Sequence, residues 1–273
     1  MKAWINIFLK RIWVIFKTII LKILYSPVYK HRVKKPINRN KIVFVEVRAD
    51  KLTDNFELLY KEFKAKGYEI KVHYIRNTFV GLWEYYKRCN SMLHDISDAR
   101  FVFLNEASDV LGAIPLRHET KIIQVWHGCG AFKKFGFSTL GIKAITYNNT
   151  SLVSVSSPEV IWAYLEAMNL KETPDKVKAL GVSRTDVYFD ENFKENAYKK
   201  FYEYYPEAKN KKIILYAPTF RGNISAGYLN KNIDMKKMRG RLSKEYILLC
   251  KFHPLAREID SFIDTSFAKD VTK

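Results

Sequence analysis

A histidine followed by glycines and lysines is the part of this sequence best suited to chemistry. The apolar run of residues 122–126 is followed by His127, Gly128, Gly130, Lys133 and Lys134. Such a run, ending in a glycine-containing basic segment, is typical of a buried parallel strand that leads into a ligand-binding loop. An imidazole can exchange a proton near neutral pH, and glycine amides and lysines can hold negative charge. The alternative is a structural turn with solvated lysines, and this stretch alone leaves both interpretations open.

Other strand ends carry groups suited to phosphate. His253 ends the apolar run 246–252, Arg184 and Asp186 lie in the turn 181–186, and Thr219 and Arg221 follow the run 211–217. Hydroxyl and guanidinium groups are donors that phosphate oxygens accept. Each feature is weak by itself, because a His-Pro pair is often a structural turn and Thr219 could cap a helix. Their recurrence at strand ends favours a phosphate-containing ligand.

The elements that must position these residues alternate along the chain. Strands are expected at 41–47, 69–75, 99–104, 122–126, 152–155, 213–217 and 246–252, and helices at 54–66, 82–93, 158–168 and 191–205. Asp54 and Glu57 are expected to form a capping box. The alternation predicts an α/β fold of two Rossmann-like, doubly wound domains. We expect an N-terminal segment over 1–35, an acceptor domain over 36–175 and a donor-binding domain over 176–273.

The first 25 residues predict an amphipathic helix that Pro27 ends or closely follows. At about 100° per residue, one continuous face holds Ile15, Ile23 and the proposed membrane-contacting residues Ile5, Phe8, Leu9, Ile12, Phe16 and Ile19. Lysines and Arg11 occupy the other face and interrupt any uncharged span, and no signal-peptide cleavage site follows. A basic cluster over 30–41 suits anionic headgroups. The pattern favours an interfacial helix at the cytoplasmic face of the cell membrane, with an ordinary core-facing helix as the alternative.

Charge and composition narrow the function further. The net charge of +19 indicates an anionic partner, and 48% apolar residues are ample for a core. A nucleic-acid binder is disfavoured, because the aromatic residues lie within strand and helix patterns. His118, His127 and Cys129 lack a fourth ligand at zinc-binding spacing, so no metal is expected. The chain contains no GxGxxG, GxxxxGK[ST] or GxSxG motif, which removes support for dinucleotide, P-loop and hydrolase sites.

Four motifs in order resemble a known family. QVWHGCGAFKKFG, GVSRTD, ILYAPTFRG and KFHP are similar to motifs of the CDP-glycerol glycerophosphotransferases of Gram-positive teichoic acid synthesis, and GAFKKFG resembles the primase-like branch. The resemblance spans about residues 97–263. It implies a GT-B-like fold and transfer of a glycerol-phosphate or ribitol-phosphate unit from a CDP-alditol. The acceptor would be a hydroxyl of a lipid-linked saccharide or polymer in teichoic acid or capsule synthesis.

The resemblance also implies roles for individual residues. His127 corresponds to the general base and His253 to a second essential histidine near the donor pyrophosphate, with no cofactor or metal. The expected substrate-binding residues are Gly128, Lys133, Lys134, Arg184, Asp186, Thr219 and Arg221. Family members continue beyond the position of Lys273, so the second domain is expected to be incomplete. A non-catalytic membrane-associated remnant or binding protein is therefore the alternative. The sequence leaves the alditol, the polymer and any homo-oligomer undecided.

Overall fold

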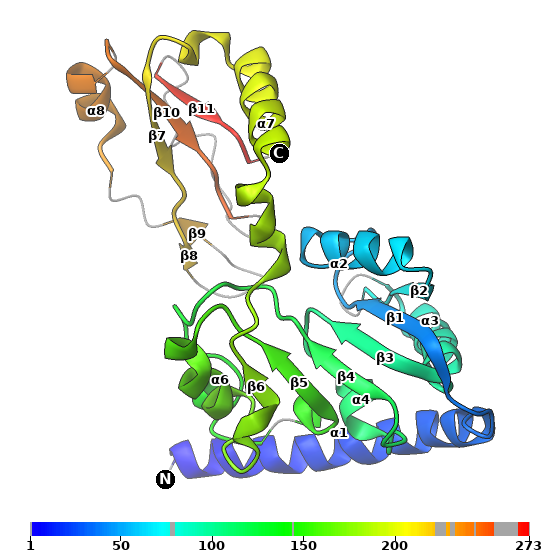
Figure 1. Ribbon diagram of the computed structural model, residues 1–273. Helices are drawn as coiled ribbons and strands as arrows, with labels where there is room; N and C mark the ends of the chain where they lie inside the picture. Colours follow the sequence, from blue (N-terminus) through cyan, green and yellow to red (C-terminus); the bar gives the residue numbers. More distant parts are fainter. Residues whose placement is uncertain are drawn as a thin grey trace. The chain divides into compact units, whose positions relative to one another are not determined.

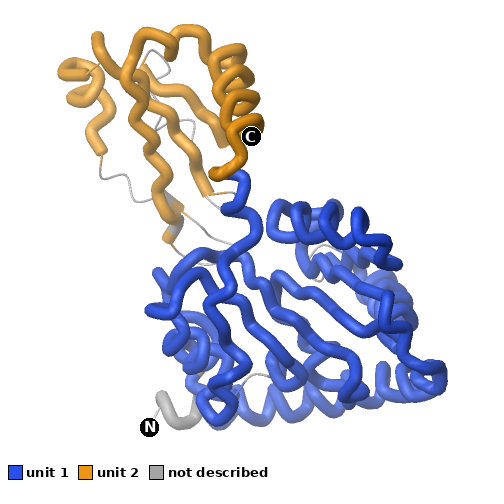
Figure 2. The backbone as a smooth tube through the Cα atoms, viewed as in Figure 1, with its two compact units in different colours: residues 1–187 blue, residues 188–273 orange. Residues whose placement is uncertain are grey.

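The structure, a computed structural model, describes residues 2–76, 80–143, 145–221, 228–229, 233–242, 244–253 and 267–272. The chain divides into two units, Met1–Val187 and Tyr188–Lys273 (Figure 2). The sequence places the boundary at 175–176, whereas the first unit continues to Val187. It does so because β6 (Val177–Lys178) pairs with β5 (Thr150–Ser154), and because the Ser183 hydroxyl donates a hydrogen bond to the Asn55 carbonyl at 3.0 Å.

Six parallel strands form the sheet of the first unit (Figure 1). In the order in which they pair, they are β2 (Glu69–Tyr74), β1 (Asn38–Glu46), β3 (Ala99–Leu104), β4 (Lys121–Gln124), β5 (Thr150–Ser154) and β6. The chain moves outward from β1 to β2 and then crosses to the other side of β1 to form β3. The carboxyl ends of β1 and β3 are therefore the switch point at which open α/β sheets bind ligands.

Helices cover both faces of this sheet. Val43 and Val45 of β1 pack in one cluster with residues of α1 (Lys2–Arg32), α3 (Leu82–Ile96) and α4 (Asp109–Ala113). Ile42 and Phe44 point to the other face and pack against α2 (Asp54–Ala65). The connections after β4, β5 and β6 hold α5 (Phe137–Leu140), α6 (Ile161–Ala167) and the 3₁₀ turns Ile145–Tyr147, Pro158–Val160, Pro174–Lys176 and Ser183–Phe189. Because successive side chains of β1 point to opposite faces of the sheet, β1 packs against helices on both faces.

The long helix α1 packs one side on the first unit and exposes the other. It continues through Pro27 to Arg32, so the prediction that the helix ends at Pro27 or shortly before it is wrong. Tyr25 and Tyr29 are buried on either side of the proline, and the Tyr29 hydroxyl accepts a hydrogen bond from the Arg117 amide at 3.2 Å. This tertiary packing offsets the hydrogen bond that proline removes.

The apolar face predicted for α1 is the side that points away from the sheet. The described side chains of that face are 47–67% exposed, namely Phe8, Leu9, Ile12, Ile15, Phe16, Ile19 and Ile23. The neighbouring Trp13, Ile20 and Leu24 are 38–61% exposed. Ile5 lies in the helix, but its side chain is outside the described part. These residues therefore do not form the core-facing stripe of the alternative interpretation. Among the helices that the structure describes, none combines the length and apolar character that a membrane span requires.

Two local predictions are corrected by side-chain hydrogen bonds. The N-cap of α2 is Thr53 and makes no side-chain cap bond, because its hydroxyl donates to Glu46 Oε1 at 2.7 Å instead. The capping box expected from Asp54 is therefore absent at this described helix start. The strand expected at 122–126 is β4, and it ends at Gln124 rather than at Trp126. It ends there because the Trp126 amide donates a hydrogen bond to the side-chain oxygen of Gln124 at 2.9 Å.

The second unit contains a smaller parallel sheet. Its strands pair in the order β11 (Ala268–Asp270), β10 (Tyr246–Cys250) and β7 (Lys212–Tyr216). Leu248 packs on the side of α8 (Met235–Leu242), and Ile247 and Leu249 pack on the side of α7 (Glu191–Tyr204). The 3₁₀ turn Pro206–Ala208 follows α7, and β8 (Phe220–Arg221) pairs antiparallel with β9 (Tyr228–Leu229). This unit is again a sheet between helices, as the sequence predicts.

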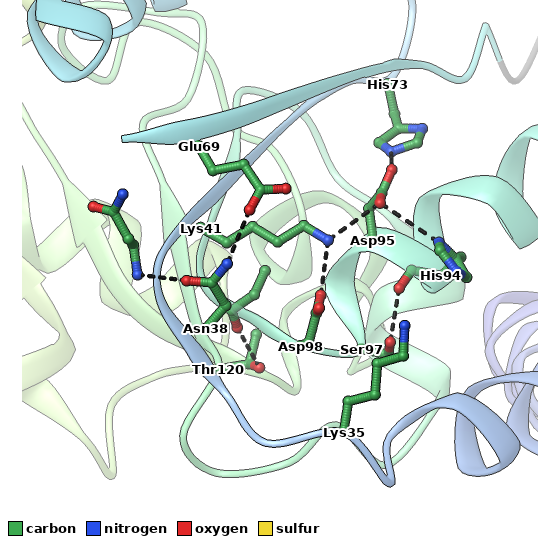
Figure 3. A network of polar contacts seen from close by, with 12 residues as sticks. Lys35, Asn38, Lys41, Glu69, His73, His94, Asp95, Ser97, Asp98 and Thr120 are labelled. Atoms are coloured by element: carbon green, nitrogen blue, oxygen red, sulfur yellow. Dashed lines mark hydrogen bonds and ion pairs between the residues drawn. The ribbon is translucent and has the colours of Figure 1, made fainter. Parts of the chain in front are cut away.

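A polar network joins β1, β2 and α3 near the amino end of β1 (Figure 3). Lys41 is 5% exposed, and its Nζ lies 2.8 Å from Asp98 Oδ1 and 3.2 Å from Asp95 Oδ1. His73 Nε2 lies 2.9 Å from Asp95 Oδ2. Burial lowers the pKa of His73 below its ordinary value of 6.5. Burial acts to raise the pKa of Asp95, but the ammonium of Lys41 and the ring of His73 outweigh it, so this pKa is lowered.

This network is expected to make the first unit less stable in acid. Because the folded pKa of His73 is lowered, its contribution is present above pH 6.5 and is lost as the pH falls below that value. The contribution of Asp95, whose pKa is also lowered, is lost only below about its ordinary value of 3.8. Urea unfolding at pH 7.5, 5.5 and 4.5 should show the early loss, and His73→Asn should abolish it. An equal early loss in the variant would contradict the assignment to His73.

Candidate active site

The carboxyl ends of β1 and β3 are joined by buried hydrogen bonds. Glu46 is 1% exposed, and its Oε1 accepts hydrogen bonds from the amide and the hydroxyl of Thr53, both at 2.7 Å. Its Oε2 accepts from Asn105 Nδ2 at 2.7 Å. These bonds fix the end of β1, the start of α2 and the segment after β3 relative to one another. The switch point therefore has a rigid base on which reactive side chains can be held.

His127 lies beside this base and is held through one ring nitrogen. Its Nδ1 is 3.1 Å from the carbonyl oxygen of Asn105 and 3.2 Å from Oε1 of Glu106. A carbonyl oxygen only accepts hydrogen bonds, so Nδ1 carries the proton in this contact and Nε2 of the neutral ring keeps its lone pair. The His127 side chain is 42% exposed, whereas that of Glu106 is only 14% exposed. The arrangement is a carboxylate-oriented imidazole with an accessible basic nitrogen.

The backbone that presents His127 turns sharply at Trp126. Trp126 has a φ of 56°, in the left-handed region that residues with a side chain rarely adopt. The buried Gln124 side chain supports this turn, because its Nε2 donates to the Glu106 carbonyl at 3.1 Å while its Oε1 accepts from the Trp126 amide at 2.9 Å. The indole packs against the His127 ring, with ring centroids 4.3 Å apart, and stacks on Phe135 at 4.9 Å. Unusual backbone of this kind is concentrated at functional sites.

The loop after His127 is fastened to α6 and to the segment after β6. Tyr164 donates from its hydroxyl to the Gly130 carbonyl at 3.1 Å, and burial, followed by the nearby Cys129, raises the pKa of Tyr164 to about 12. Gly136 has a φ of 53°, and a Cβ there would lie 2.1 Å from the Ala167 carbonyl oxygen. Only glycine fits this position. The loop is therefore a fixed part of the first unit rather than a free surface turn.

The structure brings some of the predicted residues to this edge and leaves others on the surface. Arg184 reaches the loop, with Nη2 3.8 Å from Cys129 Sγ. Asp186 lines a cavity of about 310 Å³ beside the ends of β4, β5 and β6. Lys133 and Lys134 are exposed on the same loop as His127. Gly128 does not have a positive φ, and a Cβ there would make only ordinary contact with Trp126 at 3.7 Å.

The second unit has its own group of predicted residues at one sheet edge. β7 and β10 are parallel, with Tyr216 opposite Cys250, so the segments that carry Thr219 and His253 leave the same edge. The Lys251 amide donates to the Tyr216 carbonyl at 3.0 Å and holds these two segments together. Arg221 lies on β8, directly after Thr219 and Phe220. Among the described residues, no group of three or more His, Cys, Asp or Glu side chains could hold a metal ion.

Comparison with known proteins identifies the family. Residues 27–273 match the model of the CDP-Glycerol:Poly(glycerophosphate) glycerophosphotransferase family. The chain belongs to this family. Its relatives include transferases that build teichoic acids, among them a polymerase and a primase of Bacillus spizizenii. The α/β fold, with parallel Rossmann-like sheets, is the GT-B-like fold that the sequence predicts.

Relatives within the glycerophosphotransferase family are about 30% identical to the chain over the aligned residues. The teichoic acid poly(ribitol-phosphate) polymerase of Bacillus spizizenii is 32% identical over 81% of this chain and 37% of the polymerase. The teichoic acid ribitol-phosphate primase of the same species is 29% identical over 94% of this chain and 70% of the primase. A solved variant of the wall teichoic acid polymerase TagF, soaked with CDPG, has a TM-score of 0.66 at 16% identity, covering 98% of this chain and 70% of that one. The chain thus spans little more than a third of the polymerase and 70% of the primase.

Sequence reasoning missed the residues that hold His127. Asn105 and Glu106 directly follow the apolar strand β3, so they carry the same signal that drew attention to His127 after β4. Asn105 also retains a buried Oδ1 without a hydrogen-bond partner in the described residues. The rule that polar residues after buried strands gather at one edge would have found both. Gln124 is harder to find, because a buried glutamine inside a strand has no distinctive pattern.

Proposed function

We propose that the chain transfers a glycerol-phosphate or ribitol-phosphate unit from a CDP-alditol to a hydroxyl of a lipid-linked saccharide or polymer in teichoic acid or capsule synthesis. Membership of the glycerophosphotransferase family supports the reaction class. The observation that carries the role of His127 is the contact of its Nδ1 with the Asn105 carbonyl at 3.1 Å, which leaves Nε2 as the basic nitrogen.

The proposed step is an attack on the donor phosphorus that bears the alditol. The acceptor oxygen forms a new bond to this phosphorus while its proton moves to Nε2 of His127. The bond to the bridging oxygen of the pyrophosphate breaks, and CMP leaves with that oxygen. A phosphodiester and CMP are the products, so no external oxidant, reductant or metal is needed to balance the step.

Negative charge increases on the leaving phosphate as the bond breaks. Cationic and hydroxyl donors that are already in place stabilise such charge most effectively. Arg184 is held next to the His127 loop, and Thr219, Arg221 and His253 are gathered at one edge of the second unit. We assign Thr219, Arg221 and His253 of the second unit to the donor phosphates and, within the first unit, Arg184, Asp186 and Gly128 to substrate binding beside His127. Lys133 and Lys134, exposed on the His127 loop, are assigned to the acceptor.

The direct test is CMP release from CDP-glycerol and from CDP-ribitol by the full chain, with a lipid-linked disaccharide as acceptor. Release that depends on the acceptor is expected with one of the two donors. Donor binding without any release would instead support the non-catalytic binding protein. The preferred donor would also decide between glycerol-phosphate and ribitol-phosphate transfer.

Glu106→Gln is expected to lower kcat for this reaction about 10²-fold, because a misplaced base reacts slowly. The loss should be smaller than that for His127 itself, since the Asn105 carbonyl still holds Nδ1. The KM for the donor should stay within about twofold, because Glu106 positions the base rather than the donor. Glu106→Asp should recover part of the activity. An equal loss in both variants, or a raised donor KM, would contradict the positioning role.

We further propose that α1 lies in the cytoplasmic face of the cell membrane as an interfacial helix. Ten large apolar side chains on its outer side are exposed, and patches of this size on soluble proteins mark interaction surfaces. Exposed Lys10, Arg11, Lys22 and Lys30 border them and suit anionic headgroups. A membrane position for α1 would bring the protein to an acceptor that is itself anchored in the bilayer.

Phe16→Ser combined with Ile23→Ser is expected to weaken binding to anionic vesicles about tenfold or more, because two exposed apolar side chains no longer enter the bilayer. Point substitutions test the membrane contact more specifically than deletion of α1, because deletion would also remove Tyr25 from the hydrophobic core. Vesicle flotation at fixed salt measures the effect. The matched control is Leu82→Ser with Phe132→Ser, which are 89% and 92% exposed outside α1. Equal weakening by both pairs would contradict the assignment.

A further inference from the structure

A groove runs along one side of α1 in the first unit. It has a volume of about 660 Å³ and lies between α1 and the segments at 112–115 and 148–149. Ile23, which lines the groove, is 67% exposed and also belongs to the outer apolar face of α1. The groove therefore opens beside the surface that we assign to the membrane.

Two lysines that line the groove have no ion-pair or hydrogen-bond partner among the described residues. Lys22 and Lys30 both line it, and no acidic residue does. Within the part of the chain that the structure describes, neither lysine makes an ion pair or a hydrogen bond, whereas Lys17, which precedes Lys22 in α1, is paired with Asp109. Two unpaired ammonium groups on one wall, without a carboxylate, favour an anion between them.

A buried hydroxyl lies between these two lysines. Lys22, Ser26 and Lys30 are spaced at i, i+4 and i+8, so they follow one stripe of the helix. Ser26 Oγ is buried and has no hydrogen-bond partner among the described residues. Leaving a buried hydroxyl unsatisfied is unfavourable. Because Ser26 lines the groove, rotation of its side chain would bring the hydroxyl to an oxygen of a bound anion.

We propose that this groove binds the phosphate group of an anionic membrane lipid. Lys22 and Lys30 pair with the phosphate oxygens, Ser26 donates a hydrogen bond, and the lipid chain lies against Ile23 and the outer face of α1. The proposal rests on the membrane position of α1 given under Proposed function. It adds a defined headgroup contact to what would otherwise be diffuse attraction of a basic surface.

The test uses dihexanoyl-phosphatidylglycerol below its critical micelle concentration, titrated calorimetrically into the full chain at fixed salt. Lys22→Ala with Lys30→Ala is expected to weaken binding about tenfold or more, since hydrogen-bonded charge pairs with the phosphate are lost. The matched control is Lys10→Ala with Lys34→Ala. Both control lysines are exposed and neither lines the groove. Lys10 lies about 120° from Lys22 around the helix. This pair should change the Kd by less than about twofold.

Two further binding measurements distinguish a defined lipid site from diffuse electrostatic attraction and from a site for free phosphate. Ser26→Ala should weaken lipid binding without lowering the Tm, because the hydroxyl has no hydrogen-bond partner among the residues that the structure describes. Glycerol 3-phosphate, which has no chains, should bind much more weakly than the lipid. Equal weakening by the two lysine pairs, or equal affinity for glycerol 3-phosphate, would overturn the proposal.

CMP release by the unmodified chain with a water-soluble acceptor is measured in parallel. Its absence would contradict the transferase proposal alone.

Discussion

Replacing His127 with glutamine is expected to lower kcat for CMP release about 10²- to 10⁴-fold, the range for loss of a general base. A glutamine amide can still donate to the Asn105 carbonyl, but it offers no nitrogen lone pair to the acceptor hydroxyl. The KM for the CDP-alditol should change little, because the proton moves only in the transition state. Steady-state CMP release at saturating acceptor measures both quantities.

The fold should tolerate this change, which makes the loss of activity interpretable. The His127 side chain is 42% exposed, so its replacement leaves no closed cavity. His118→Gln is the matched control, because His118 has a 90% exposed side chain and precedes β4, at the opposite end of that strand. The control should keep full activity. Retention of more than about a tenth of the activity by His127→Gln would remove His127 from the role of general base.

The fold was predictable because its signals are local. Period-two alternation in 42–45 sorts side chains to the two faces of the sheet, and β3 has the predicted bounds, Ala99–Leu104. The helical stripe of apolar residues in α1 is likewise readable from spacing alone. The end of the helix could not be predicted from the sequence, because Pro27 is tolerated only through the burial of Tyr25 and Tyr29. Tertiary packing overrode a local helix-breaking signal.

The site was predictable in part. His127 was found because a glycine-rich segment follows a strand, but its partners come from a different strand. Glu106 reaches the ring only because β3 and β4 are neighbours in the sheet, and Arg184 reaches Cys129 only because β6 closes the sheet beside β5. Strand order is a property of the whole chain and is not written in any one motif. The Trp126 turn also depends on a distant contact, since Gln124 must reach the Glu106 carbonyl.

Lys41→Met is expected to have the largest effect on stability, a loss of about 3 kcal/mol in the free energy of unfolding, because it leaves carboxylates without their cation. Lys41 is 5% exposed, and the side chains of Asp95 and Asp98 are only 18% and 21% exposed. Burial acts to lower the pKa of Lys41, but its hydrogen bonds to Asp98 and Asp95 raise it overall, so the pair favours the charged form. Methionine keeps the apolar length of the side chain and removes the charge.

Urea unfolding followed by tryptophan fluorescence measures this loss in the first unit alone. All five tryptophans precede residue 187, at Trp4, Trp13, Trp83, Trp126 and Trp162. The triple variant Lys41→Met, Asp95→Asn, Asp98→Asn should recover most of the lost stability, because no buried charge is then left unpaired. If Lys41→Met changed the unfolding free energy by less than about 1 kcal/mol, the ion pairs would not be a source of stability. If the triple variant were no more stable than Lys41→Met, the loss would not come from carboxylates left without their cation.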